Sequence, residues 1–285
     1  MYIVSSQRSS DFSSKMSARS MSHLSPVEKK RFPDGELYIR IMDNLQDQDV
    51  AVVGNTRSEE DILELLFLLN AVKEQKPKSI TAVIPFFGYA RQHMVYKSGE
   101  AISSKVIIRS ISEVAEKIVT VDIHDTASFS FTDRECINFS PVESIARNHR
   151  KDSINMVVAP DDGAFEKAKA VAKALGADSM YLEKKRTGPT TVEYEKETMN
   201  VKGMNVLVVD DIISTGGTMM KTVEMLKAAG AAKIFVTATH GLFLNGSAEK
   251  LRKMCDRLST TDTIVSDYST INISMDVMDY MGEKK

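Results

Sequence analysis

The most informative segment of the chain is Val206-Leu207-Val208-Val209-Asp210-Asp211-Ile212-Ile213-Ser214-Thr215-Gly216-Gly217-Thr218. Its four leading apolar residues end abruptly in acid, which is typical of a parallel strand covered on both faces by helices. Open sheets of this kind bind ligands at the carboxyl ends of their strands. We therefore expect Asp210 and Asp211 to lie at a ligand site.

The residues that follow the acid pair form a candidate anion site. Residues 214–218 supply hydroxyl groups and unobstructed backbone N–H groups, and a helical pattern continues from Met219 to Ala229. A helix start carries roughly half a positive charge and several unpaired donors, which suits a phosphate dianion. Carboxylates suit sugar hydroxyls or a hydrated metal. The whole segment predicts a ribose phosphate ligand, and a strand that simply ends in a capped helix is the alternative.

Size and charge limit the classes of function. The 285 residues suffice for two domains of ordinary size. A net charge of −2 disfavours nucleic acid as a partner, because phosphate-backbone binding needs a basic face. No apolar run reaches the length of a membrane span, and the amino terminus shows no leader pattern, so we expect no membrane association.

The two cysteines, Cys136 and Cys255, lie far apart and have no C-x-x-C partner. This usage favours a reducing compartment and argues against a cysteine-ligated metal. We expect a cytoplasmic protein in which both thiols are small buried side chains. The serine-rich start, residues 5–25, is expected to fold because Phe12 and Met16 recur at helical spacing.

Apolar strands alternate with helical patterns along most of the chain. The expected strands are 50–54, 79–85, 117–123, 155–159, 178–183, 204–210 and 232–238, and the expected helices are 59–74, 101–115, 163–175 and 216–229. This alternation predicts an α/β protein with two similar domains, each a mainly parallel sheet flanked by helices.

The two halves also resemble each other in sequence order. The strand that starts at Asp49 and the strand that starts at Asn205 are each followed by a helix and another strand, at an offset of about 155 residues. Such an offset hints at duplication, and chance similarity of strand and helix units is the alternative. We place the domains at 1–140 and 141–274, with residues 275–285 packing back on the first.

Two segments of the first half place polar residues in turns. The segment 31–36, Arg-Phe-Pro-Asp-Gly-Glu, has the composition of a turn, and a hairpin turn explains it when taken alone. The segment 88–93, Gly-Tyr-Ala-Arg-Gln-His, follows an apolar strand. This segment either binds a polyphosphate or a purine, or is an ordinary surface loop.

Three later segments place charge at the ends of strands. His124 follows the strand 117–123 and stands among carboxylates, where it is either structural or associated with Mg²⁺. Asp161 precedes a glycine and a helix start, which suits metal and diphosphate binding or a simple helix cap. The run Glu-Lys-Lys-Arg at 183–186 opens a polar segment that is either a solvated face or a cationic lid.

Taken together, these segments resemble the ribose-phosphate diphosphokinases, also called phosphoribosyl diphosphate (PRPP) synthases. The matching motifs are Arg-Phe-Pro-Asp-Gly-Glu (31–36), Tyr-Ala-Arg-Gln (89–92), Asp-Ile-His (122–124), Pro-Asp-Asp-Gly (160–163), Glu-Lys-Lys-Arg (183–186) and Val-Val-Asp-Asp-Ile-Ile-Ser-Thr-Gly-Gly-Thr (208–218). They run in the family's order across most of the chain. The resemblance implies the type I phosphoribosyltransferase fold in both domains, in a compact form similar to that of archaeal members.

The resemblance also implies a role for each candidate residue. Contacts to ATP would come from Phe32, Asp34 and Glu36 of a neighbouring subunit and from Arg91, Gln92 and His93 of the same subunit. Mg²⁺ would be held by His124 and Asp161, and the catalytic cations would be Lys184 and Arg186. Ribose 5-phosphate would bind through Asp210, Asp211, Ser214, Thr215, Gly216, Gly217 and Thr218.

The implied reaction transfers the β,γ-diphosphate of MgATP to the C1 hydroxyl of ribose 5-phosphate and releases AMP. ATP is then a co-substrate, Mg²⁺ is the cofactor, and the active site lies at a subunit interface of a homo-oligomer. Transfer of this kind depends on alignment and charge neutralisation, which fits a site of cations, metal ligands and N–H donors.

Two positions depart from the family pattern, and two other functions compete. His93 stands where many relatives carry Asp, and Ala164 where a second glycine is frequent. A PRPP-consuming phosphoribosyltransferase would share the 206–218 segment but leave the segments 31–36 and 89–92 without a task. An inactive associated subunit is the non-enzymatic alternative, although such a protein would be free to lose Lys184. No Walker or dinucleotide glycine motif is present.

Overall fold

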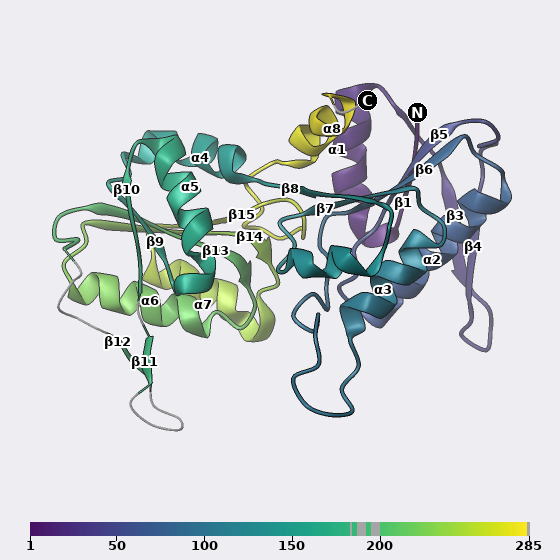
Figure 1. The fold of residues 1–285 in the computed structure, drawn as a ribbon. Coiled ribbons are helices and arrows are strands. Elements are labelled where there is room, and N and C mark those ends of the chain that lie inside the picture. Colours follow the sequence, from purple (N-terminus) through teal and green to yellow (C-terminus); the bar gives the residue numbers. More distant parts are fainter. Residues whose placement is uncertain (183, 187–191, 195–199, 284–285) are drawn as a thin grey trace. The chain divides into compact units, whose positions relative to one another are not determined.

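The computed structural model describes residues 1–182, 184–186, 192–194 and 200–283. Within this part of the chain there are two compact units, each with its own parallel sheet (Figure 1). Unit 1 combines Met1–Ser140 with the C-terminal segment that starts at Ser274, and unit 2 is Pro141–Ile273.

Unit 1 is built on a six-stranded sheet in which every pairing is parallel, with the order β2-β1-β5-β6-β7-β8. Its strands are β1 (Tyr2–Ser5), β2 (His23–Leu24), β5 (Asp49–Val53), β6 (Ser79–Ile84), β7 (Lys117–Val121) and β8 (Glu135–Phe139). The central strands are apolar on both faces because helices cover both sides.

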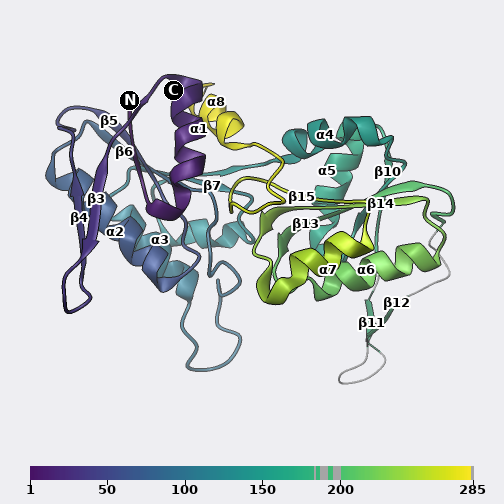
Figure 2. The same ribbon diagram turned by 180° about the vertical axis from the view of Figure 1, so that it is seen from behind.

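Two pairs of helices enclose this sheet. The helix α1 (Ser10–Ser20) packs against α8 (Ser274–Glu283), and α2 (Glu59–Glu74) packs against α3 (Ser103–Ser112). Figures 1 and 2 show the two pairs on opposite faces of the sheet, as right-handed crossovers in opposite directions require. Arg19 of α1 and Asp279 of α8 form a two-pronged ion pair, with Nε–Oδ1 at 2.9 Å and Nη2–Oδ2 at 2.8 Å.

The helix α2 shows why the sequence starts a helix where it does. Ser58 caps it by accepting a hydrogen bond from the Asp61 backbone N–H at 3.3 Å, and three acids lie in the first turn. Acids near a helix start are stabilised by its partial positive charge. Leu65, Leu68 and Val72 then face the core of unit 1 and are fully buried.

Unit 2 repeats this architecture with a five-stranded parallel sheet in the order β10-β9-β13-β14-β15. Its strands are β9 (Met156–Ala159), β10 (Asp178–Tyr181), β13 (Asn205–Ile213), β14 (Lys233–Gly241) and β15 (Arg257–Thr260). Its helices are α4 (Val142–His149), α5 (Phe165–Leu175), α6 (Gly217–Ala228) and α7 (Ser247–Met254). The helices α4 and α5 pack together, as do α6 and α7, and the two pairs cover opposite faces (Figure 1).

Each unit also carries an antiparallel hairpin outside its main sheet. The first joins β3 (Val27–Arg31) to β4 (Leu37–Ile41), and the second joins β11 (Lys184–Arg186) to β12 (Val192–Tyr194). Short 3₁₀ turns are η1 (Gln7–Ser9), η2 (Thr126–Phe131), η3 (Arg150–Asp152), η4 (Asp162–Ala164) and η6 (Leu244–Gly246).

The strand order places a ligand-binding position in each unit. In unit 1 the chain leaves β1 toward β2 on one side and β5 toward β6 on the other, so the order reverses between β1 and β5. In unit 2 the order reverses between β9 and β13. Parallel α/β sheets bind ligands outside the carboxyl ends of the strands at such reversals.

The expected α/β architecture of parallel sheets and flanking helices is confirmed. The expected strand 117–123 is shorter, because Asp122 adopts a positive φ of 46° that ends β7 at Val121. The strand expected at 204–210 is longer and continues through the acid pair to Ile213. The sequence analysis did not anticipate β8 and β15, nor α4 and α7, which are each eight residues long.

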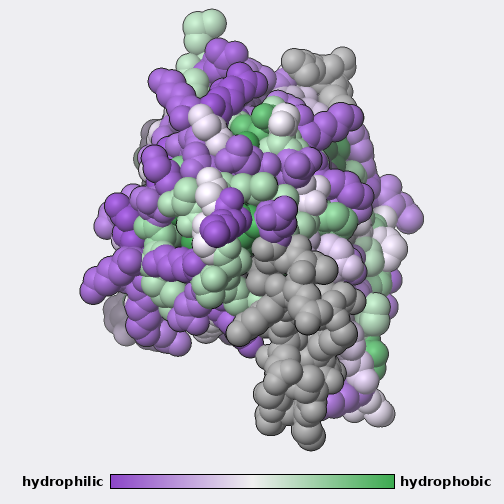
Figure 3. Space-filling view, turned by 90° about the vertical axis from the view of Figure 1, so that its left-hand side faces the viewer, coloured by the Kyte–Doolittle hydropathy of each residue, from purple (hydrophilic) through white to green (hydrophobic). Residues whose placement is uncertain are grey.

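The surface is mixed in polarity (Figure 3), and the two thiols are free. None of the described helices combines the length and apolarity needed to cross a bilayer. On the face seen in Figure 3, hydrophilic side chains are interspersed with hydrophobic ones. Both cysteines are free, and burial raises the pKa of Cys136 and of Cys255 to about 11.

Candidate active site

The loop between β13 and α6 has the geometry of an anion site. Gly216 adopts φ 75° immediately before the helix, and a Cβ there would approach Ser247 Cβ to 3.0 Å. Gly217 faces open space. No described side chain caps this helix start, so its first backbone N–H groups are available to an anion beside the exposed Thr215 and Thr218.

The turn after β14 holds this loop from behind. The Ser214 carbonyl oxygen accepts hydrogen bonds from the Leu244 backbone N–H at 2.9 Å and from Ser247 Oγ at 3.2 Å. The Ile213 carbonyl oxygen accepts from the Leu242 N–H at 2.9 Å. These contacts fix the loop so that its N–H groups are preorganised for a ligand.

The acid pair lies within the last part of β13. Asp210 pairs with Ala238 of β14, and its Oδ1 accepts the Asp211 backbone N–H at 2.9 Å. Burial raises the pKa of Asp210 to about 8, and the adjacent charge of Asp211 acts in the same direction. Lys167 of α5 opposes this rise. The sequence analysis missed Lys167, because only the fold brings α5 beside β13.

The loop after β9 supplies the second half of this site. Asp161 directly precedes η4 in an extended conformation, and its side chain accepts no capping hydrogen bond from the backbone of that turn. Asp162 and Gly163 are exposed, whereas Ala164 is buried beneath them. Because β9 and β13 are neighbours, the loops that follow them lie at the same edge of the sheet, at the strand-order reversal.

In unit 1 the structure brings together the loops after β6 and β7. His93 Nε2 lies 3.2 Å from Asp125 Oδ2, and Gln92 Oε1 accepts a hydrogen bond from Ser103 Oγ at 2.7 Å. Arg91 is exposed. Asp125 was not among the predicted site residues, since nothing in the sequence indicated its pairing with His93.

His124 lies on the turn that follows β7. The positive φ of Asp122 turns the chain, and the Ile123 backbone N–H donates to Asn138 Oδ1 at 3.0 Å. His124 is exposed at the end of this turn. It belongs to unit 1, whereas Asp161 belongs to unit 2.

The segment 31–36 forms the predicted hairpin turn between β3 and β4. The Phe32 N–H donates to the Glu36 carbonyl at 2.9 Å, and Gly35 adopts φ 94°. The side chains of Phe32, Asp34 and Glu36 are all exposed. The Phe32 and Tyr38 rings pack edge to face, with their centroids 5.8 Å apart.

Two predictions extend beyond what the structure describes. The backbone of β11 contains Lys184 and Arg186, but their side chains and the residues 187–191 and 195–199 of the expected lid lie outside the described part. Across the described residues there is no group of three or more His, Cys, Asp or Glu side chains arranged to hold a metal. A Mg²⁺ ion carried by nucleotide phosphates needs only one or two oxygen ligands from the protein, and the Asp161 carboxylate is a ligand of this kind.

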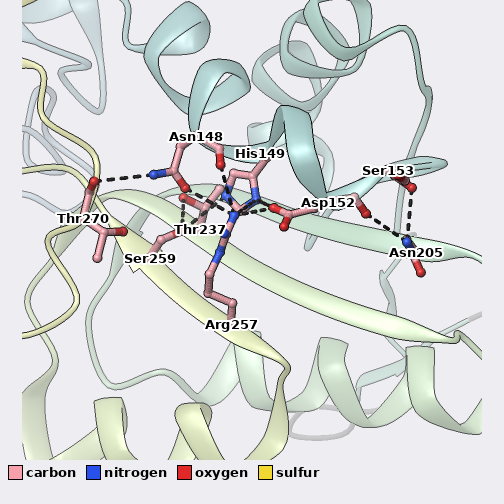
Figure 4. Close-up of polar contacts among 9 residues, drawn as sticks. All are labelled: Asn148, His149, Asp152, Ser153, Asn205, Thr237, Arg257, Ser259 and Thr270. Atoms are coloured by element: carbon pink, nitrogen blue, oxygen red, sulfur yellow. Dashed lines mark hydrogen bonds and ion pairs between the residues drawn. The ribbon is translucent and has the colours of Figure 1, made fainter.

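A separate polar cluster lies at the other edge of the unit 2 sheet, where β13 and β15 begin (Figure 4). His149 is fully buried, and its Nδ1 lies 2.8 Å from Asp152 Oδ2, which also pairs with Arg257. Burial lowers the pKa of His149 to about 4, with Arg257 acting in the same direction and Asp152 opposing. This cluster joins α4 to β15 and is remote from the carboxyl ends of the strands.

Comparisons with known proteins show the family of the chain. Residues 1–115 match the family described as the N-terminal domain of ribose phosphate pyrophosphokinase, and residues 139–275 match the phosphoribosyl transferase domain. A ribose-phosphate pyrophosphokinase of Thermoplasma acidophilum is 40% identical over 284 residues, which cover 100% of this chain and 99% of that protein. The Thermococcus kodakarensis protein of the same name is 42% identical over 250 residues, or 87% and 89% of the two chains.

A solved structure supports the fold. The phosphoribosylpyrophosphate synthetase from Mycobacterium smegmatis superposes with a TM-score of 0.87 and 22% identity, covering 100% of this chain and 99% of that one. At this identity the likeness bears on the fold alone. With both domain families matched and relatives similar along the whole length, the chain belongs to the ribose-phosphate pyrophosphokinase family of enzymes.

Proposed function

We propose that the protein transfers the β,γ-diphosphate of ATP to the C1 hydroxyl of ribose 5-phosphate, giving PRPP and AMP. The observation that carries this proposal is the uncapped start of α6, preceded by the acid pair of β13, in a chain of this family. The 5-phosphate accepts hydrogen bonds from the N–H groups and hydroxyls of residues 214–218. The ribose hydroxyls bind Asp210 and Asp211.

The nucleotide is assigned to loops of unit 1. Arg91, Gln92 and His93 contact it from one subunit, and the turn bearing Phe32, Asp34 and Glu36 reaches it from a neighbour. The exposure of that turn supports this assignment, because three residues suited to bind adenine have their side chains available. The active site is then complete only in a homo-oligomer.

Mg²⁺ is assigned to Asp161 and His124 together with the nucleotide phosphates, whose negative charge the ion offsets when bound. Lys184 and Arg186 are assigned to the diphosphoryl group in transfer. Cations placed where charge develops stabilise the transition state more than the ground state. The C1 hydroxyl attacks the β-phosphorus, the bond from that phosphorus to the AMP oxygen breaks, and the hydroxyl proton passes to solvent.

Phosphorus NMR of a mixture of enzyme, ATP, Mg²⁺ and ribose 5-phosphate tests this function without any nucleobase. We expect AMP and PRPP to appear in equal amounts, and no AMP when ribose 5-phosphate is omitted. A PRPP-consuming enzyme would leave both substrates intact. Absence of AMP from the complete mixture would refute the proposal.

A further inference from the structure

The two hairpins of the described residues share a run of sequence. Glu-Lys-Lys-Arg occurs at 28–31, within β3, and again 155 residues later at 183–186, of which Lys184–Arg186 form β11. The helices α1 (Ser10–Ser20) and α5 (Phe165–Leu175) are separated by the same 155 residues. The hairpin of unit 1 is therefore the internal counterpart of the hairpin to which the catalytic cations are assigned.

Unit 1 has a cavity at the point that corresponds to the ligand site of unit 2. It lies at the carboxyl end of β1 and has a volume of about 510 Å³. Ser6, Gln7 and Ser10 line it from the start of η1 and α1, and Lys29 and Arg31 line it from β3. In unit 2 the equivalent loop and hairpin are assigned to the diphosphate and the catalytic cations.

In unit 1 a carboxylate takes the place of a ligand anion. Glu64 of α2 lines the cavity, and its side chain is only 7% exposed. Its Oε1 accepts the Gln7 backbone N–H at 2.8 Å, and its Oε2 lies 2.6 Å from Lys29 Nζ. A bound phosphate would use these same two donors, and a buried carboxylate would repel a second anion. The Glu64 carboxylate thus occupies two of the donors that line the cavity.

This carboxylate also ties the hairpin to the body of unit 1. Lys29 lies on β3, close to the turn at 32–36 that bears Asp34 and Glu36. One helical turn earlier on α2, Glu60 pairs with Arg31 at 2.9 Å, but both side chains are more than half exposed. Exposed pairs contribute little, whereas the Glu64 carboxylate is buried, although Lys29 itself is exposed. Glu64 therefore makes the stronger of these two charged contacts with the hairpin.

We propose that Glu64 is a positioning residue for ATP binding. By holding Lys29 it fixes the direction of the β3–β4 hairpin, and so places Phe32, Asp34 and Glu36 against the nucleotide of the neighbouring subunit. The proposal rests on the proposed function.

Steady-state kinetics of Glu64→Gln tests the proposal, because Gln keeps an acceptor for the Gln7 N–H and replaces the oxygen that holds Lys29 with an NH2 donor. We expect the KM for ATP to rise about tenfold, with kcat and the KM for ribose 5-phosphate changed by less than about twofold. Hydrogen exchange should accelerate in residues 27–41 and not elsewhere. Glu60→Gln is the matched control on the same helix, with every parameter expected within about twofold of wild type.

The double variant Glu64→Gln/Lys29→Met guards against simple misfolding. Replacing Lys29 as well removes the ammonium group that would face the new amide, so we expect the double variant to be more stable than Glu64→Gln and to recover part of the ATP affinity. An unchanged KM for ATP in folded Glu64→Gln, or equal effects on both substrates, would overturn the proposal. If the wild type released no AMP, the proposed function would fail instead, and the hydrogen exchange of residues 27–41 would alone decide whether Glu64 holds the hairpin.

Discussion

At the scale of single residues, Asp210 shows how a residue proposed to bind ligand can act against folding. Its carboxyl group lies at the end of a buried strand beside another acid, and its pKa is raised to about 8. The folded protein therefore holds a proton there at neutral pH that the unfolded chain releases. Such groups persist where function needs them, because sequence selected for stability alone would place an uncharged side chain there.

We predict that Asp210→Asn makes folding less sensitive to pH. In the wild type the folded state binds the extra proton between the ordinary pKa of 3.8 and about 8, so the unfolding free energy falls as pH rises through that window. One proton accounts for a slope of at most about 1.4 kcal/mol per pH unit, and the variant should lose it. Chemical denaturation at several pH values measures the slope, and equal slopes in both proteins would contradict the assignment. The affinity for ribose 5-phosphate should fall in the same variant.

We predict that Lys184→Ala and Arg186→Ala each lower kcat by on the order of 10²-fold or more, because each removes a cation from the group in transfer. Binding of ribose 5-phosphate, measured by calorimetry, should stay close to wild type. Turnover near normal in both variants would remove these cations from the mechanism. Lys185→Ala, from the same strand, is the comparison for a general effect of charge.

At the scale of elements, the start of α6 joins local backbone geometry to function. Gly216 has a positive φ and is packed against Ser247 and Leu251, while Gly217 beside it faces open space. Only glycine adopts the first conformation without strain. The loop is therefore specified by one glycine for its shape and by the other for access to its N–H groups.

We predict that Gly216→Ala destabilises the protein by about 1 to 2 kcal/mol, since an L side chain at positive φ is strained and the new Cβ meets Ser247. Gly217→Ala should leave the melting temperature nearly unchanged, because a Cβ there meets nothing within 4 Å. Thermal denaturation of the two variants compares them directly. Equal melting temperatures would show that the loop does not have this conformation.

The polar cluster between α4 and β15 predicts a second pH dependence, of opposite sign. His149 stays neutral in the fold to about pH 4, whereas the unfolded chain protonates it near 6.5. The unfolded state then binds more protons between these values, so stability falls as pH drops from 6.5 to 4, by at most about 1.4 kcal/mol per unit. The nitrogen chemical shifts of the His149 ring should show no protonation above pH 5. A midpoint near 6.5 would contradict this burial.

At the scale of the whole molecule, the sequence predicted what depends on local pattern. Long apolar runs such as Val206–Val209 predict buried parallel strands. The glycine-rich turn after Asp211 predicts the start of a helix. The strand β15 was not predicted, because its sequence is Arg-Leu-Ser-Thr and its buried hydroxyl residues have the composition of a loop. Contacts such as Lys167 near Asp210, or Glu64 with Lys29, link residues far apart in the chain and needed the fold.

The account depends most on where ribose 5-phosphate binds, and diffraction from crystals soaked with that compound measures this directly. We predict that its phosphate lies against the backbone N–H groups of residues 216–218, with the ribose hydroxyls on Asp210 and Asp211. A phosphate found at any other place, or those N–H groups turned into packed protein, would contradict the account.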